Sequence, residues 1–240
     1  MPATNICVWL NGARESERPI WSKLWNNAEK RYCTDGGANQ VVNRDQKLRP
    51  PDVVVGDMDS ILPMVKDGLK LTTLLIHTPD QNKTDLTKCL EGARVVLLGG
   101  TSGRFDHVLA AINSMLYSTT LMTQEVFCLE GENLTFVLNE GEHYIKVDQK
   151  LITGTCGVIP FCQKTTVVTM TGFRWNLEGI EMAFGGLIST SNVIEENVLQ
   201  IKTTAPLLFT MELQPSASEK IAEIINLWRR VSRFTERGPS

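Results

Sequence analysis

Residues 53–60 read Val-Val-Val-Gly-Asp-Met-Asp-Ser, an apolar run that ends at a glycine and is followed by two carboxylates one residue apart. Three consecutive β-branched residues suit a strand that is covered on both faces, as in a parallel sheet. Gly56 lets the chain turn as it leaves the strand, and Ser60 is predicted to cap a helix over residues 61–69. We therefore expect the two acids at the carboxyl end of a parallel strand, the edge at which open α/β sheets bind ligands.

The acidic pair suggests a metal site. On an extended chain, residues i and i+2 point the same way and lie about 6 to 7 Å apart, so Asp57 and Asp59 can face one point. Their mutual repulsion is about 2 to 3 kcal/mol at an effective dielectric constant near 20. A hard cation between them would offset this cost, and Mg²⁺ prefers such oxygen ligands. The alternative is an Asp-rich turn in which the two side chains cap backbone amides, and the pair alone does not decide between them.

The first half of the chain alternates between strand and helix patterns. This alternation predicts a doubly wound, mainly parallel, Rossmann-like α/β sheet whose loops gather on one edge. The further strands are expected at residues 6–10, 71–77 and 94–98, with a short one before Asp35, and the further helices at 21–31, 84–90 and 107–117.

From residue 125 the hydrophobic period changes to about two, which predicts an all-β sandwich. Its strands are expected at residues 125–129, 134–138, 143–147, 153–160, 166–171, 180–184, 186–189, 198–203 and 207–213. An amphipathic helix is predicted at 217–234, where Ile221, Ile225 and Trp228 share a face. The expected domains are an α/β domain at 1–122, a β domain at 123–213 and a helical extension at 214–240.

Composition narrows the class of protein. With 240 residues and 42% apolar content, the chain can bury an ordinary core. A net charge of −3 provides no basic footprint for nucleic acid, so none is expected as a partner. Six cysteines without a Cys-x-x-Cys pair indicate reduced thiols and a cytoplasmic protein. No basic leader and no apolar run of about 20 residues is present, so neither secretion nor membrane insertion is expected.

Further polar groups follow the other predicted strands of the α/β half. Each has a simple explanation, such as an acid at a helix N-terminus or a surface ion pair. Together, acids and one arginine around a glycine-rich loop predict a metal–nucleotide site, where acids hold magnesium and the arginine neutralises phosphate. Neither G-x-x-x-x-G-K-[ST] nor G-x-G-x-x-G occurs. The groups are Asp35, Asp57 with Asp59, Asp80 with Asp85, Gln81, and Arg104 with Asp106.

These stretches resemble a known family. Residues 35–39 (DGGAN), 56–60 (GDMDS), 78–85 (TPDQNKTD) and 99–106 (GGTSGRFD) are similar, in this order, to successive motifs of thiamine pyrophosphokinases. The stretches GFRWNL at 172–177 and STSN at 189–192 resemble the remaining motifs. The resemblance implies an N-terminal α/β domain that binds ATP and Mg²⁺, a C-terminal thiamine-binding β-sandwich, and a homodimer. It further implies transfer of a diphosphoryl group from ATP to the hydroxyl of thiamine, which yields thiamine diphosphate and AMP.

The resemblance also implies roles for individual residues. Asp57, Asp59 and Asp85 would hold magnesium, Asp80 and Gln81 would orient its waters or the hydroxyl, and Arg104 would bind ATP phosphate. Asn82 stands where relatives commonly carry an acid and receives no metal role. The implied catalytic set is Asp57, Asp59, Asp80, Asp85 and Arg104, and the implied nucleotide-binding set is Asp35, Gly36, Gln81, Thr84, Gly100, Arg104 and Asp106.

Thiamine carries a fixed positive charge and a flat pyrimidine, so an aromatic face with hydroxyl and amide groups would suit it. The residues of the matching motifs are Trp175, Ser189, Ser191 and Asn192, although Trp175 could instead be a core residue. The acidic motifs precede residue 107 and the aromatic motif follows residue 171, so we expect each active site to be shared across a dimer.

Two other classes of function remain open at the level of sequence. A nucleotide-sugar transferase could use residues 57–59 as a D-x-D metal motif. A non-catalytic thiamine or nucleotide sensor could retain the pocket and bind without releasing AMP.

Overall fold

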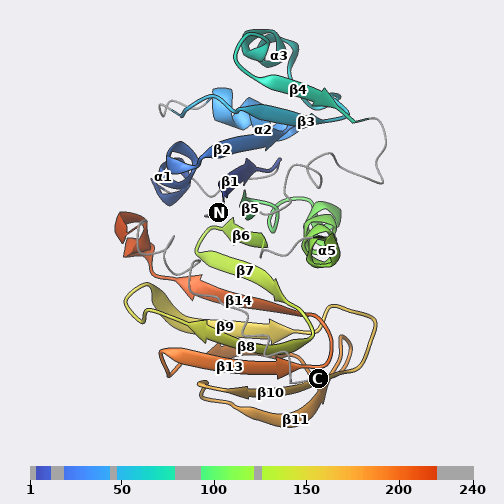
Figure 1. Ribbon diagram of the computed structural model, residues 1–240, viewed down its shortest axis with the longest axis vertical. Helices are drawn as coiled ribbons and strands as arrows, with labels where there is room; N and C mark the ends of the chain where they lie inside the picture. The colour runs from blue at the N-terminus through green and yellow to red at the C-terminus, as the bar shows by residue number, and fades with distance from the viewer. Residues whose placement is uncertain (1–3, 12–18, 44–47, 79–92, 122–125, 221–240) are drawn as a thin grey trace, which may run out of the picture. The chain divides into compact units, whose positions relative to one another are not determined.

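The computed structural model describes residues 4–11, 19–43, 48–78, 93–121 and 126–220 (Figure 1). The chain divides into two compact units, Met1–Gly131 and Glu132–Ser240. The fold is mixed α/β, and each unit is described by itself below.

The strands of the first unit run parallel. Their order in the sheet is β6-β5-β1-β2-β3-β4. The chain therefore adds strands on one side of β1 and then returns to add strands on the other side, so the carboxyl ends of all six lie on one edge. The strands are β1 (Thr4–Trp9), β2 (Lys30–Thr34), β3 (Val53–Gly56), β4 (Leu74–His77), β5 (Ala93–Leu98) and β6 (Val126–Glu130).

The helices of this unit correct several predictions. The helix expected at 21–31 is wrong at its end, because β2 begins at Lys30, where Arg31 binds Asp52 through its backbone N–H and its guanidinium. A helix at 35–42 was not predicted. Ser60 caps no helix, since α3 has Leu62 at its N-cap and begins at a proline. The helices are α1 (Pro19–Asn27), α2 (Asp35–Val42), α3 (Pro63–Leu69) and α5 (Phe105–Leu121).

Three tryptophans fix α1 against β1. The ring of Trp9 meets those of Trp21 and Trp25 edge to face, with centroids 5.4 and 5.5 Å apart, and all three side chains are fully buried. Such pairs add stability beyond the area they bury. The indole N–H of Trp9 donates to the Gln40 Oε1, which ties α2 to the same cluster at the end of β1.

The second unit contains two antiparallel sheets, with strand orders β12-β9-β14-β7 and β11-β10-β13-β8. Phe136, Phe173 and Phe209 form its aromatic core, with ring centroids 5.3 and 6.3 Å apart. The strand predicted at 186–189 is wrong, because the strand in this region begins at Ser189 and continues to Val193. The strands are β7 (Asn133–Leu138), β8 (Gly141–Lys146), β9 (Ile152–Ile159), β10 (Thr166–Thr171), β11 (Leu177–Met182), β12 (Ser189–Val193), β13 (Val198–Thr203) and β14 (Leu207–Leu213).

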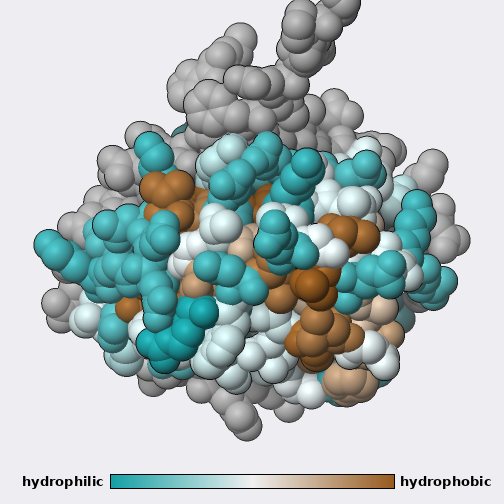
Figure 2. All heavy atoms as spheres, turned by 90° about the horizontal axis from the view of Figure 1, so that it is seen from below, coloured by the Kyte–Doolittle hydropathy of each residue, from teal (hydrophilic) through white to brown (hydrophobic). Residues whose placement is uncertain are grey.

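The described part of the C-terminal extension is a 3₁₀ turn, η1 (Pro215–Lys220), in which Ala217 is buried. The rest of the helix predicted at 217–234 lies outside the described residues, as does the helix predicted at 84–90. No helix among the described residues is long and apolar enough to cross a membrane. Figure 2 shows small hydrophobic patches interspersed with hydrophilic side chains on the face it presents.

At Gly37 the first turn of α2 lies close to the backbone of β1, and a substitution there tests this approach. A Cβ at this position would lie 2.4 Å from the backbone carbonyl oxygen of Trp9. Backbone cannot move aside as a side chain end can, so we expect Gly37→Ala to lower the free energy of unfolding by about 1 to 3 kcal/mol. Urea denaturation of the purified protein measures the change.

The matched control is Gly68→Ala in α3, where a Cβ would meet nothing within 4 Å. Alanine in an open helical position should stabilise the protein by up to about 1 kcal/mol. Equal effects of the two substitutions would contradict the close approach at Gly37.

Candidate functional site

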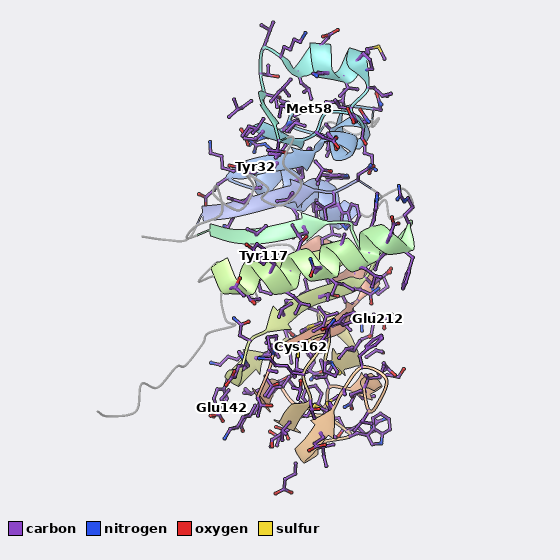
Figure 3. The ribbon with its side chains drawn as sticks, turned by 90° about the vertical axis from the view of Figure 1, so that its right-hand side faces the viewer. Tyr32, Met58, Tyr117, Glu142, Cys162 and Glu212 are labelled. Atoms are coloured by element: carbon purple, nitrogen blue, oxygen red, sulfur yellow. The ribbon has the colours of Figure 1, made fainter. Side chains whose placement is uncertain are left out.

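The acidic loop after β3 is a turn rather than an extended segment. Met58, marked in Figure 3, has a φ of 65°, and the backbone N–H of Asp59 donates to Asp57 Oδ1 at 3.1 Å. A left-handed conformation costs a non-glycine residue about 1 to 2 kcal/mol. The extended geometry that we expected for Asp57 and Asp59 is therefore wrong: the chain reverses at Met58, and both carboxyls remain exposed.

Asp35 brings a third carboxyl to this loop. It follows β2, which pairs with β3 so that Thr34 lies opposite Val55. A Cβ on Gly56 would lie only 2.7 Å from Asp35 Cγ, so the glycine leaves room for this side chain. Asp35 accepts hydrogen bonds from the backbone N–H groups of Gly36 at 2.7 Å and Ser60 at 3.4 Å.

The pKa values of Asp35 and Asp57 are shifted in opposite directions. Partial burial raises the pKa of the Asp35 carboxyl, and its hydrogen bond with Asp57 raises it further. The N–H of Asp59 lowers the pKa of Asp57, and Asp35 acts in the same direction. The two carboxyls therefore titrate differently at the same edge of the sheet, with Asp35 keeping its proton to higher pH than Asp57.

Two asparagines, neither of them a predicted site residue, lie close to this region: Asn39 belongs to α2, and Asn11 lies against its first turn. The Asn39 side chain donates to Ser60 O at 2.7 Å and accepts from the N–H of Leu62 at 2.8 Å, which fastens the loop to α2. A Cβ on Gly36 would strike the side chain of Asn11, which follows β1. The sequence could have indicated both residues, because Asn39 lies within the DGGAN motif and Asn11 directly follows a predicted strand.

A pocket of about 420 Å³ opens beside the loop. Besides the acids it contains a lysine from α3 and a histidine that ends β4 opposite Gly56. Neither residue was a predicted site residue. His77 nevertheless stands at the carboxyl end of a predicted strand, where the predicted acids also lie. The lining residues are Asp57, Met58, Asp59, Lys66, Leu75 and His77.

The glycine-rich loop lies further along the same edge. Gly99 and Gly100 have φ values of 84° and 106°, which suits a sharp exit from β5. Arg104 donates to Asp106 through Nε at 3.1 Å and Nη2 at 2.5 Å, and both side chains are exposed. Three strand spacings, about 14 Å, separate β5 from β3, so Arg104 does not join the acidic loop directly.

Four predicted site residues lie outside the described residues: Asp80, Gln81, Thr84 and Asp85. The predicted metal set of Asp57, Asp59 and Asp85 therefore stays a prediction. Within the described residues no group of three or more His, Cys, Asp or Glu side chains is placed to hold a metal ion.

In the second unit, three of the four thiamine-site candidates, Trp175, Ser189 and Asn192, share one hydrogen-bond network. Trp175 is 57% exposed, so it is not a core residue. The Asn192 side chain is buried and fully used, accepting from the N–H groups of Trp175 and Val193 and donating to Trp175 O and Ser189 Oγ. Ser191 is exposed and has a φ of 56°. Asn192 therefore holds Trp175 and Ser189 in place.

The first unit presents acids and a glycine-rich loop on the carboxyl edge of a parallel sheet, which is typical of nucleotide-dependent enzymes. Comparison with known proteins narrows this class. Residues 21–127 match the family description "Thiamin pyrophosphokinase, catalytic domain", and residues 142–208 match "Thiamin pyrophosphokinase, vitamin B1 binding domain". The chain belongs to the thiamin pyrophosphokinase family, whose members are enzymes.

Individual relatives agree. The chain is 33% identical over 222 residues to Thiamin pyrophosphokinase 1 of Caenorhabditis elegans, with 88% of this chain and 90% of the relative covered. It is 33% identical over 218 residues to Thiamine pyrophosphokinase 1 of Oryza sativa, with 80% and 81% covered. The fold is similar to thiamin pyrophosphokinase from Candida albicans, with a TM-score of 0.77, 21% identity, and 88% of this chain and 90% of that one covered.

The Asp35–Asp57 contact predicts how stability depends on pH. The folded-state pKa of Asp35 is raised, so its contribution to stability is present at acidic pH and is lost as pH rises through that pKa. Asp35→Asn removes the titration and can keep one acceptor and one donor. Without added metal, we expect the variant to gain about 1 kcal/mol over the parent at pH 7 but little at pH 4, after allowance for solvent screening.

Thermal unfolding at several pH values measures this difference, which corresponds to about 2 to 4 °C in Tm. A difference that is the same at every pH would mean that packing, and not charge, distinguishes the variant.

Proposed function

We propose that the acidic loop and its neighbours bind magnesium–ATP in the transfer of a diphosphoryl group to thiamine. The observation that carries this proposal is the cluster of acids after β2 and β3: Asp35 accepts from the N–H of Ser60, and Asp57 and Asp59 line a pocket with Lys66 and His77. A protein of this family forms thiamine diphosphate from thiamine, and the other product of the reaction with ATP is AMP. These comparisons support neither of the two alternatives, a nucleotide-sugar transferase and a non-catalytic thiamine or nucleotide sensor.

The reaction needs no nucleophilic side chain. The hydroxyl oxygen of thiamine forms a bond to the β-phosphorus of ATP, the bond from that phosphorus to the α,β-bridging oxygen breaks, and AMP leaves while the hydroxyl proton is released. Such transfers depend mainly on positioning and on neutralisation of phosphate charge. Arg104, held along one edge of its guanidinium by Asp106, has further N–H groups for phosphate.

The residues present fit a hard divalent cation. Asp57 and Asp59 carry exposed carboxylates on this loop, and such hard oxygen donors suit Mg²⁺. When bound, Mg²⁺ would neutralise negative charge on the polyphosphate. In our proposal Asp57 and Asp59, together with Asp85, hold the ion, and Asp80 and Gln81 orient the hydroxyl.

The finer architecture is also proposed. We assign a doubly wound, Rossmann-like catalytic domain to the first unit and a thiamine-binding β-sandwich to the second, supported by the strand orders and the two matched families. The protein would act in the cytoplasm, supported by free thiols at all five described cysteines. It would be a homodimer with each active site formed by both subunits.

The metal assignment predicts that Asp57→Asn and Asp59→Asn each reduce AMP release by at least about 100-fold, equivalent to roughly 3 kcal/mol of transition-state stabilisation. Binding of Mn²⁺, followed by electron paramagnetic resonance, should weaken in parallel. The control is Asp67→Asn in α3, whose carboxylate pairs with Lys70 on the surface. AMP release and Mn²⁺ affinity close to those of the parent in both site variants would refute the assignment.

The shared site predicts complementation between subunits. Mixing Asp57→Asn chains with Asn192→Ala chains should produce heterodimers that contain one intact site and one doubly altered site, so activity should rise above that of either parent. Sites within single chains would each carry one alteration, and exchange could restore nothing. Heterodimers demonstrated by mass spectrometry but without a gain in AMP release would refute the shared site and leave the chemistry intact.

A further inference from the structure

The loop 172–176 presents an exposed tryptophan with a cation over its ring. Arg174 Cζ lies 5.8 Å from the centroid of the Trp175 ring, within the range of a cation–π contact. More than half of the Trp175 surface remains exposed. An aromatic ring of this kind offers a flat apolar face to a ligand, while part of its surface is already covered by the guanidinium.

The backbone that carries Trp175 is fixed on both sides. The N–H and C=O of Trp175 both bind the Asn192 side chain, at 3.2 and 2.9 Å. The N–H of Arg174 donates to Val193 O at 2.8 Å, and Phe173 forms an isolated bridge with Ile194. The ring is therefore mounted on an ordered loop, and a ligand that stacks on it would meet a preorganised surface.

An acid neutralises the cation beside the ring. Arg174 Nε donates to Glu195 Oε1 at 2.8 Å. The Arg174 side chain is 54% exposed and that of Glu195 48%, so the pair contributes little to stability. Glu195 is itself held where the chain crosses this loop, because its N–H donates to Gly172 O at 3.0 Å. The Arg174–Glu195 ion pair adds little stability, yet it lies directly beside the exposed ring of Trp175.

We propose that Arg174 and Glu195 are positioning residues that determine how a charged ligand stacks on Trp175. Arg174 covers one side of the ring, so the ligand binds on the uncovered side. Glu195 cancels the charge of Arg174, so a cationic ring system can approach without repulsion. The inference rests on the proposed function, in which thiamine, a permanent cation, stacks on Trp175.

The proposal has a consequence that depends on ligand charge. In Glu195→Gln the guanidinium keeps its place near the ring but loses its counter-charge. Repulsion between two unit charges at such distances, in a partly solvated site, corresponds to roughly a three- to tenfold loss of affinity. A neutral ligand should not experience this loss, and an anionic one such as thiamine diphosphate should bind as well as before or better.

The experiment measures dissociation constants by titration calorimetry on the full-length protein. The ligands are thiamine, thiamine diphosphate and the neutral aminopyrimidine alcohol that lacks the thiazolium ring. The variants are Glu195→Gln, Arg174→Ala, the double variant and Arg174→Lys, with Glu178→Gln, an exposed acid on β11, as the matched control.

We expect Glu195→Gln to weaken thiamine three- to tenfold, less at high salt, and to leave the neutral pyrimidine unchanged. The double variant should recover affinity for thiamine, since the uncompensated charge is gone, and Arg174→Lys should behave like the parent. In steady-state assays the KM for thiamine should rise in Glu195→Gln while kcat stays constant.

Equal weakening of the neutral pyrimidine and thiamine in Glu195→Gln, or no recovery in the double variant, would show that the pair only supports the loop and would overturn the proposal. Trp175→Ala separates this outcome from a failure of the proposed thiamine site. Loss of thiamine affinity in Trp175→Ala leaves that site standing whatever the pair does. Unchanged affinity would overturn both the site and the inference.

Discussion

The candidate site depends on the contact between two carboxyls at the ends of neighbouring strands. Parallel pairing of β2 with β3 brings Asp35 beside Gly56, where only a glycine leaves room for the side chain. Partial burial raises the pKa of the Asp35 carboxyl, and the neighbouring Asp57 raises it further. Asn39 and the N–H of Ser60 hold the turn around this contact. The register of two parallel strands therefore gathers acids from separate loops at one point of the sheet edge.

The second unit presents a flat aromatic surface, the ring of Trp175, to solvent. A tryptophan on an unsupported loop would lose backbone freedom on binding, at a cost in affinity. Asn192 removes that cost by binding both backbone polar groups of Trp175, and it is buried so that water does not compete. Asn192, which the sequence resemblance assigned to thiamine binding, therefore supports the loop that carries Trp175.

Charge is handled differently in the two units. Around Asp57 the acids stand together beside a single lysine and a histidine, an arrangement suited to a cation accompanied by phosphate. Around Trp175 the one basic side chain is already paired with an acid, so the surface has little net charge. In the proposed function, the first arrangement would receive magnesium–ATP and the second would receive the cationic thiamine.

The sequence by itself determined the order of elements and the place of the acids. Three valines before a glycine suit a strand that is covered on both faces, as in a parallel sheet, and alternation of period two marks the strands of the second unit. The tertiary structure decided what local pattern does not contain. The bend at Met58 accompanies a hydrogen bond from the N–H of Asp59 to the Asp57 side chain, and Arg31, predicted to be helical, lies in β2 and pairs with Asp52 from a distant segment. The contact of Asp35 with Asp57 and the clamp of Asn192 on Trp175 join residues 22 and 17 positions apart, and only the register of neighbouring strands and loops brings such residues together.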